Sequence, residues 1–135
     1  MEFDLSRDFL EAISLSHPKA PANDKAELKA NGGLHFLPSS PDGTMHTAIV
    51  SFSVKIDGQE QAFAQGAWRF LFTTSEQYDP KANQQNPFNR QLLVLGASKI
   101  IAVLNTSCMH ANMPLIPVDA QRLTQSTGGQ PPGDG

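Results

Sequence analysis

The sequence predicts a small α+β domain in which antiparallel strands pack against one long helix. Three observations support this class. Apolar and polar residues alternate over residues 3–15 and again over 48–56, which is the period of a strand. An Asp57-Gly58 pair follows the second run and is typical of a tight hairpin turn. An Asn86-Pro87 pair then opens a long apolar stretch with helical spacing.

The opening stretch favours one long strand. Apolar or long side chains alternate with short polar ones, and the alternation breaks once around Leu10. We interpret the break as a β-bulge, which inserts one extra residue into a strand. A short helix opened by Ser6 is the alternative, but the period of two favours the strand.

A second, weaker strand signal covers residues 25–37, where Asn31 and two glycines interrupt the apolar residues. The residues before it, 17–24, contain two prolines and read as a connection. The residues after it, 38–43, are Pro-Ser-Ser-Pro-Asp-Gly, a composition typical of a turn.

The hairpin is the clearest element. Its first strand runs to Ile56, and the return strand is expected over residues 59–73. A two-residue turn pairs Phe52 with Phe63 and leaves three aromatic side chains on the opposite face, namely Trp68, Phe70 and Phe72. Both faces of the sheet would then be apolar. We therefore expect one face to meet the helix and the other a partner subunit or a client.

The helix is expected to run from Pro87 to about Cys108, with Asn86 as its cap. One apolar stripe follows helical spacing, and further apolar residues widen it around the circumference. A helix this apolar predicts burial on two sides, the second side being another copy of the chain. The expected oligomer interface is the stripe Leu93, Ala97, Ile100, Ile101 and Leu104.

Domain organisation follows from length and composition. At 135 residues the chain suits one domain, which we place at residues 1–120. Residues 121–135, QRLTQSTGGQPPGDG, have the composition of a disordered polar tail.

Composition narrows the class of partner and the compartment. Net charge is −3 and no basic stripe exists, which argues against nucleic-acid binding. We expect no membrane insertion, since no uninterrupted apolar run reaches membrane-spanning length. Acidic residues stand where a signal peptide would carry basic ones, and a single cysteine allows no internal disulfide. A soluble cytoplasmic protein is the expectation.

The sequence offers little chemistry for catalysis. The histidines at 17, 35, 46 and 110 lack metal-ligand spacing, and Cys108 and His110 diverge at a helix end. Paired carboxylates and phosphate-binding loops are absent as well. We therefore expect a binding protein with no cofactor and no metal, and not an enzyme.

Three segments together resemble SecB, the protein-export chaperone family. The opening stretch ends with Ile13-Ser-Leu-Ser16 and a Pro18-x-x-Pro21, similar to the family's first strand. Ala62-Phe63 resembles the start of its third strand, and Asn86-Pro87 opens a similar main helix. Met113-Pro-Leu-Ile-Pro-Val-Asp119 resembles the segment after that helix. The resemblance touches residues 3–21 and 44–119.

The resemblance implies a four-stranded antiparallel sheet with one main helix packed on one face, assembled as a homotetramer, a dimer of dimers. It also implies ATP-independent holding of unfolded precursor polypeptides, which keeps them competent for export or assembly. The client would meet apolar side chains, for which we expect Leu15, Phe36, Phe52, Val54, Phe63, Leu115 and Ile116.

The chain departs from the family in its net charge, which is less negative, in lacking a clear Gly-aromatic pair late in the third strand, and in two further respects. The family's acidic positions that contact the SecA motor fall on Ala12 and Ser16, and a second C-terminal helix is not evident. A chaperone dedicated to one client, as in toxin–antitoxin systems, fits these departures as well as a general one.

Two hypotheses from other classes stay open. One is a ligand-binding domain or enzyme with a pocket lined by His46, Trp68, Phe70 and Phe72. The other is a subunit that assembles only with a different protein.

Overall fold

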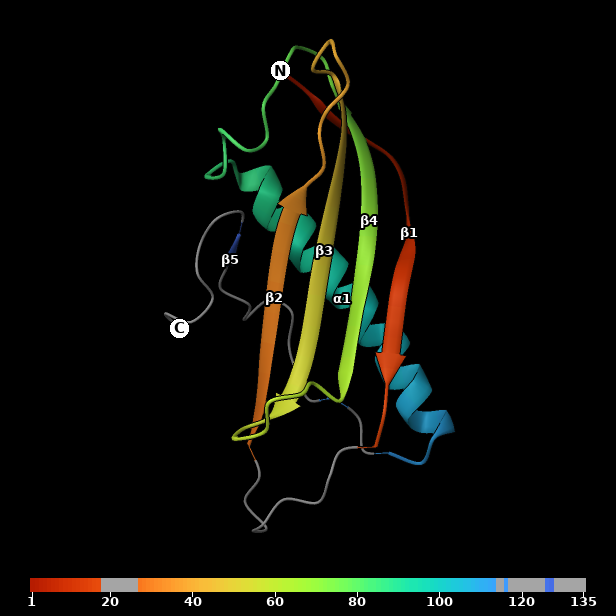
Figure 1. Cartoon of the computed structure of the whole chain (residues 1–135). Helices are drawn as coiled ribbons and strands as arrows, with labels where there is room; N and C mark the ends of the chain where they lie inside the picture. The colour runs from red at the N-terminus through yellow and green to blue at the C-terminus, as the bar shows by residue number, and fades with distance from the viewer. Residues whose placement is uncertain (18–26, 114–115, 117–125, 128–135) are drawn as a thin grey trace.

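The computed structural model describes residues 1–17, 27–113, 116 and 126–127, and it has an α+β fold. Four antiparallel strands form the sheet in the order β1-β4-β3-β2, and a two-residue strand, β5, pairs in parallel with β2. The elements in chain order are β1 (Phe3–Leu15), β2 (Leu28–Phe36), β3 (Met45–Ile56), β4 (Ala64–Thr74), α1 (Pro87–His110) and β5 (Ser126–Thr127). The helix crosses one face of the sheet, as Figure 1 shows. The predicted four-stranded sheet with one main helix is confirmed.

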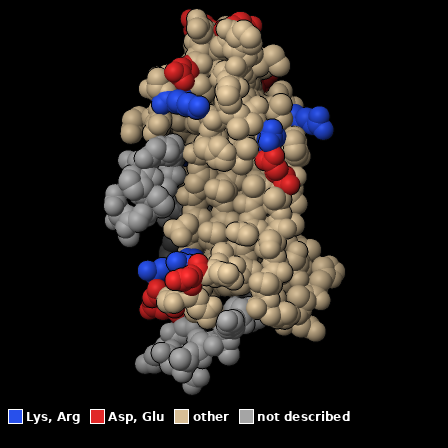
Figure 2. Space-filling model, viewed as in Figure 1, with Lys and Arg blue, Asp and Glu red and all other residues tan. Residues whose placement is uncertain are grey.

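The core lies between α1 and the sheet face that it covers. Its strand residues alternate along β3 and β4, and its helix residues recur every three or four positions. The fully buried large side chains include Val50, Phe52, Val54, Phe70, Phe72, Leu92, Leu93, Ile100 and Leu104. None of the described elements covers the other face of the sheet, which Figure 2 views directly and which we call the uncovered face.

The start of α1 follows the prediction closely. The Oδ1 of Asn86 accepts a hydrogen bond from the backbone N–H of Phe88 at 2.9 Å, and Pro87 is the first helical residue. By length and composition α1 would suffice to cross a membrane, but 44% of its apolar window is buried inside the molecule. The core helix of a soluble protein passes the same test, so this is weak evidence for a membrane span.

The opening stretch is one long strand, as the alternation predicts. Register shifts occur between Leu5 and Arg7 and between Leu10 and Ala12. The second is the predicted bulge near Leu10, and the first lies in a part of the pattern that shows no break. The strand β2 passes through Asn31 and its two glycines without interruption, and the turn after it contains Gly43 at φ 73°.

The predicted register of the hairpin is wrong. The structure pairs Phe52 with Gly66 instead of Phe63, because residues 57–63 form a longer loop. A turn does form over Asp57 and Gly58, where the N–H of Gln59 donates to the Ile56 carbonyl at 2.9 Å, but the return strand starts only at Ala64. The shift is three residues, an odd number, and therefore reverses which side chains share a face.

The corrected register places Phe70 and Phe72 on the helix face with Val50 and Phe52. Both rings are at most 1% exposed and fill the space between sheet and helix, where the ligand-binding hypothesis expected a pocket. The uncovered face therefore carries the alternate side chains of β3 and β4. These are more polar than the predicted register implied.

Of the predicted polar tail, the structure describes Ser126 and Thr127, which pair with Gly33 and Leu34 of β2. The rest of residues 121–135, the two prolines at 18 and 21 and most of the segment after α1 lie outside the described residues. The domain boundary at residue 120 stays a prediction.

Candidate polypeptide-binding surfaces

Most of the side chains expected to meet a client lie in the core. Four of them are at most 7% exposed between sheet and helix, namely Phe36, Phe52, Val54 and Ile116. Leu15 and Phe63 are half-buried at the edge of this core, and Leu115 lies outside the described residues. A client reaches the buried four only if sheet and helix separate.

The residues expected at the oligomer interface also face inward. All five are at most 9% exposed and pack against the chain's own sheet: Leu93, Ala97, Ile100, Ile101 and Leu104. The face of α1 that points away from the sheet carries a different set, including the exposed Leu95, Ala102 and Met109. A partner copy would meet this outer face first.

Exposed large apolar side chains concentrate on β1. Leu5, Phe9 and Ile13 are each 37–38% exposed, although they sit in a well-paired strand. Residues four apart share one face of a regular strand, but the bulge between each pair places Phe9 on the opposite face from Leu5 and Ile13. The strand thus presents apolar side chains on both of its faces.

The same strand forms one edge of the sheet. Among the described residues β1 pairs with β4 alone, which leaves the backbone N–H and C=O groups of its outer edge without a strand partner. An edge of thirteen residues with exposed apolar side chains is a template for another extended chain.

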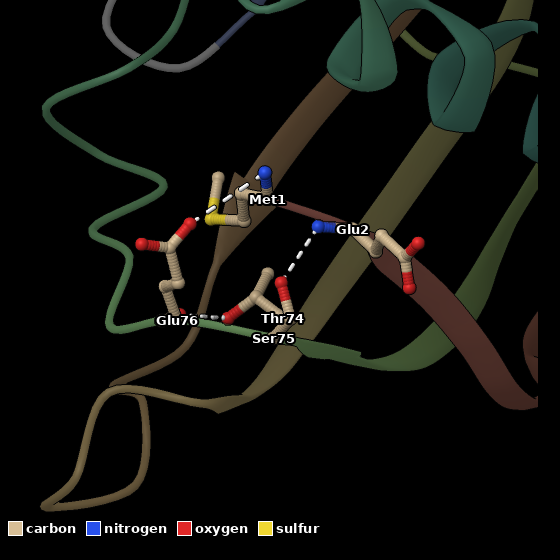
Figure 3. Close-up of polar contacts among 5 residues, drawn as sticks. All are labelled: Met1, Glu2, Thr74, Ser75 and Glu76. Carbon is tan, nitrogen blue, oxygen red and sulfur yellow. Dashed lines mark hydrogen bonds and ion pairs between the residues drawn. The ribbon is translucent and has the colours of Figure 1, made fainter.

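Both ends of β1 are held in place by hydrogen bonds. At its start, the N–H of Glu2 donates to the Oγ of Ser75 at 2.7 Å, and the Ser75 N–H donates to the Glu2 carbonyl at 3.0 Å. The Met1 amino group lies 3.5 Å from the Glu76 carboxylate, as Figure 3 shows. At its end, the N–H of Ser16 donates to the Phe63 carbonyl at 2.8 Å. The edge is therefore preformed, which lowers the entropic cost of binding.

A charged cluster holds the middle of β1 to the helix. The Asp8 carboxylate accepts a hydrogen bond from Trp68 Nε1 at 2.7 Å. It also forms an ion pair with Lys99, whose Nζ lies 2.8 Å from Oδ2. The Lys99 and Trp68 hydrogen bonds lower the pKa of Asp8 below its ordinary value. Sequence reasoning missed this cluster, because its members are far apart in the chain.

The positions that correspond to the SecA contacts are exposed. Ala12 lies within β1 and Ser16 follows its end, and both are uncharged. The nearest acidic side chain on the strand, Glu11, is paired with Arg69 on β4. Neither Ala12 nor Ser16 therefore supplies the carboxylate that the family resemblance associates with SecA.

The buried titratable side chains His46 and Cys108 are part of the core of the described structure. His46 is 3% exposed, and its ring nitrogens lie 2.7 Å from Ser39 Oγ and 3.0 Å from Thr74 Oγ1. The Thr74 hydroxyl donates to the Glu76 carbonyl, so Nε2 of His46 donates to Thr74 and Nδ1 accepts from Ser39. The described residues contain no group of three or more potential metal ligands, and burial raises the pKa of the Cys108 thiol.

Comparison with known proteins identifies a solved structure with a similar fold. No protein-family model matches the chain, and no curated protein matches it. Among solved structures, the chain is similar to the SecB-like chaperone Rv1957 of Mycobacterium tuberculosis, in complex with a ChAD peptide from the Rv1956 HigA1 antitoxin. The TM-score is 0.55 at 13% sequence identity, over 87% of this chain and 86% of that one. The chain therefore has a SecB-like fold, as the sequence resemblance implied.

Proposed function

We propose that this protein is an ATP-independent chaperone that binds unfolded or precursor polypeptides and keeps them from aggregating. The SecB-like fold supports a chaperone role, and its solved neighbour holds a peptide from another protein. The observation that carries the proposal is the β1 edge, which combines unpaired backbone groups with exposed Leu5, Phe9 and Ile13. The proposal places this activity in the cytoplasm, before export or assembly.

Binding at the β1 edge needs no nucleotide. An extended client segment adds to the sheet as a further strand, and its backbone supplies the hydrogen bonds that the edge lacks. Apolar client side chains meet Phe9 on one face and Leu5 or Ile13 on the other. Because backbone groups carry much of this interaction, the client sequence matters little, which suits a protein that holds many clients.

A chaperone dedicated to one client is the second candidate. The solved neighbour carries a peptide from an antitoxin, which favours this alternative for a protein of the same fold. Both the general and the dedicated chaperone are proposed to self-associate into a tetramer. The contact between copies would be the outer face of α1. The uncharged Ala12 and Ser16 do not support a role for SecA.

The test is light scattering of a chemically unfolded, aggregating client, with and without this protein and without ATP. We expect suppression of aggregation near one chaperone assembly per client. A protein that leaves aggregation of several unrelated clients unchanged at several-fold excess is not a general holdase, and the dedicated alternative remains.

A matched pair of variants tests whether β1 is the surface. Phe9→Lys places a charge at the exposed apolar edge, and we expect it to abolish most of the suppression. The control Asp4→Lys also adds a positive charge to an exposed position on the same strand. Equal suppression by Phe9→Lys and the control would show that clients bind elsewhere.

A further inference from the structure

The uncovered face of the sheet contains a hollow of about 570 Å³ that crosses all four long strands. Its floor is one cross-strand row in which every side chain is small. Paired positions place Gly33 beside Ser51, Ser51 beside Ala67, and Ala67 beside Ala12. Side chains two residues away along each strand rise beside this floor, so the hollow runs across the strands.

The two rows beside the floor differ in chemistry. One row consists of uncharged hydrogen-bonding side chains, namely Asn31, Ser53, Gln65 and Ser14. The row on the other side is taller and consists of His35, Ile49, Arg69 and Phe9. Amide and hydroxyl side chains both donate and accept, which matches the alternating groups of a polypeptide backbone.

Apart from Arg69 in the taller row, no charged side chain stands beside the floor. The residues that line the hollow include no Asp, Glu, Lys or Arg, and the middle of this face is free of charged side chains in Figure 2. The nearest guanidinium, that of Arg69, is already paired with Glu11. A charged ligand entering this hollow would lose water without gaining a partner of opposite charge.

We propose that this hollow binds an uncharged, extended segment of a client polypeptide that lies across the strands. The inference rests on the proposed function and adds a second, more selective surface to the β1 edge. Four neighbouring strands span ~14 Å, which about four or five extended residues cover. The small floor leaves room for one or two bulky apolar client side chains, while Asn31 and Gln65 bond the client backbone.

A second copy of the chain fits this face less well. Two sheets that pack face to face bury apolar rows against each other. The row with Asn31, Ser53 and Gln65 is polar, so packing against a second copy would bury little apolar surface there. A polypeptide backbone supplies hydrogen-bond partners for these side chains.

The test measures fluorescence anisotropy of two labelled ten-residue peptides. One alternates Leu with Ser and Asn, and the other replaces the polar residues by Asp and Lys. The variant Ser51→Tyr fills the hollow at an exposed strand position that suits an aromatic residue. The control Thr47→Tyr places the same side chain on the same strand and face, outside the hollow. Ala67→Tyr fills the hollow from β4, and thermal melts confirm that each variant folds.

We expect the uncharged peptide to bind wild type and Thr47→Tyr alike, and both filling variants at least about tenfold more weakly. The charged peptide should bind wild type at least about tenfold more weakly than the uncharged one. Unchanged peptide affinity in both folded filling variants overturns the hollow but leaves the holdase proposal standing. If wild type suppresses aggregation but binds neither peptide, the hollow is also overturned. If Ser51→Tyr and Ala67→Tyr change the particle mass of the protein but not its affinity for the uncharged peptide, the occupant is a second copy of the chain. That result contradicts the inference.

Discussion

At the scale of single residues, Asp8 is the carboxylate that fastens β1 to the rest of the fold. Its pKa is lowered by the Lys99 and Trp68 hydrogen bonds, so the ionised form stabilises the folded state above the ordinary pKa of a carboxyl. That contribution is lost as pH falls through the lowered pKa. We predict that Asp8→Asn lowers the free energy of unfolding by about 1–2 kcal/mol at pH 7 and by much less near pH 2.

Urea unfolding followed by the fluorescence of Trp68, the single tryptophan, measures this difference. The control is Asp57→Asn, which removes a largely exposed ion pair with Lys29 and should cost less than about 0.5 kcal/mol. A difference between wild type and Asp8→Asn that is as large at pH 2 as at pH 7 would rule out the carboxylate charge as its source.

His46 predicts a second pH effect, at higher pH. Burial lowers its pKa, although Asp42 and Asp79 act in the opposite direction, so the unfolded chain takes up a proton before the folded one does. Stability should therefore fall as pH drops from 7 to 5, by at most about 1.4 kcal/mol per pH unit. His46→Asn should flatten this slope, whatever its effect at pH 7.

Thermal or urea unfolding at half-unit pH steps measures the slope. The control variant is His35→Asn, which makes the same substitution at an exposed position on β2. If His46→Asn keeps the full slope, another group is responsible for it.

These residue-level contacts are the part of the molecule that sequence cannot predict. Asp8 and Trp68 are sixty residues apart, and no local pattern relates them. Their contact depends on two bulges in β1 and on where α1 crosses the sheet. A charged residue such as Asp8 has the same sequence neighbours whether its side chain forms an ion pair or faces water.

At the scale of the elements, local signals predicted α1 and β1 well. Asn86 and Pro87 fix the start of the helix through a cap and a missing N–H, which are properties of those residues alone. The register of β3 and β4 depends instead on residues 57–63. A turn forms with Gly58 at φ 90°, but Asp57 does not share the positive φ that a tight hairpin turn needs, and the return strand starts only at Ala64. Long-range contacts decided where that loop ends.

The helix approaches the sheet closely at Gly96, and this close approach predicts a third effect. A Cβ added there would lie 2.6 Å from the Cβ of Val50, a distance too short for two carbons. Gly96→Ala gains about 1 kcal/mol of helix propensity but forces α1 away from β3. We predict a net destabilisation of about 1–3 kcal/mol by urea unfolding.

Ser98→Ala, at an exposed position two residues further along the helix, is the matched control and should change stability by less than about 0.5 kcal/mol. A Gly96→Ala protein as stable as wild type would mean that the helix tolerates a wider spacing from the sheet.

At the scale of the whole molecule, the predicted fold is right and the predicted site residues largely face the core. Periodicity identifies which residues are apolar and in which element, and that is enough for fold class. It does not say which apolar residues remain exposed. Phe52 and Phe9 both belong to stretches that alternate apolar and polar residues, yet Phe52 is 1% and Phe9 37% exposed. The difference arises because α1 covers one face of the sheet and nothing described covers the other.

The outer face of α1 carries the last prediction, that of assembly. Its exposed residues include Leu95, at 40%, and Met109, at 68%, with Ala102 between them. We predict that the protein self-associates through this face, because a partner helix would remove these side chains from water. Ala102→Glu should shift the mass measured by light scattering toward a smaller species. Gln61→Glu adds the same charge to an exposed loop and should not. If the wild-type protein is monomeric, the prediction is wrong and the outer face of α1 is free to bind clients. If Ala102→Glu leaves a tetramer intact, the copies meet elsewhere, with the β1 edge as the next candidate.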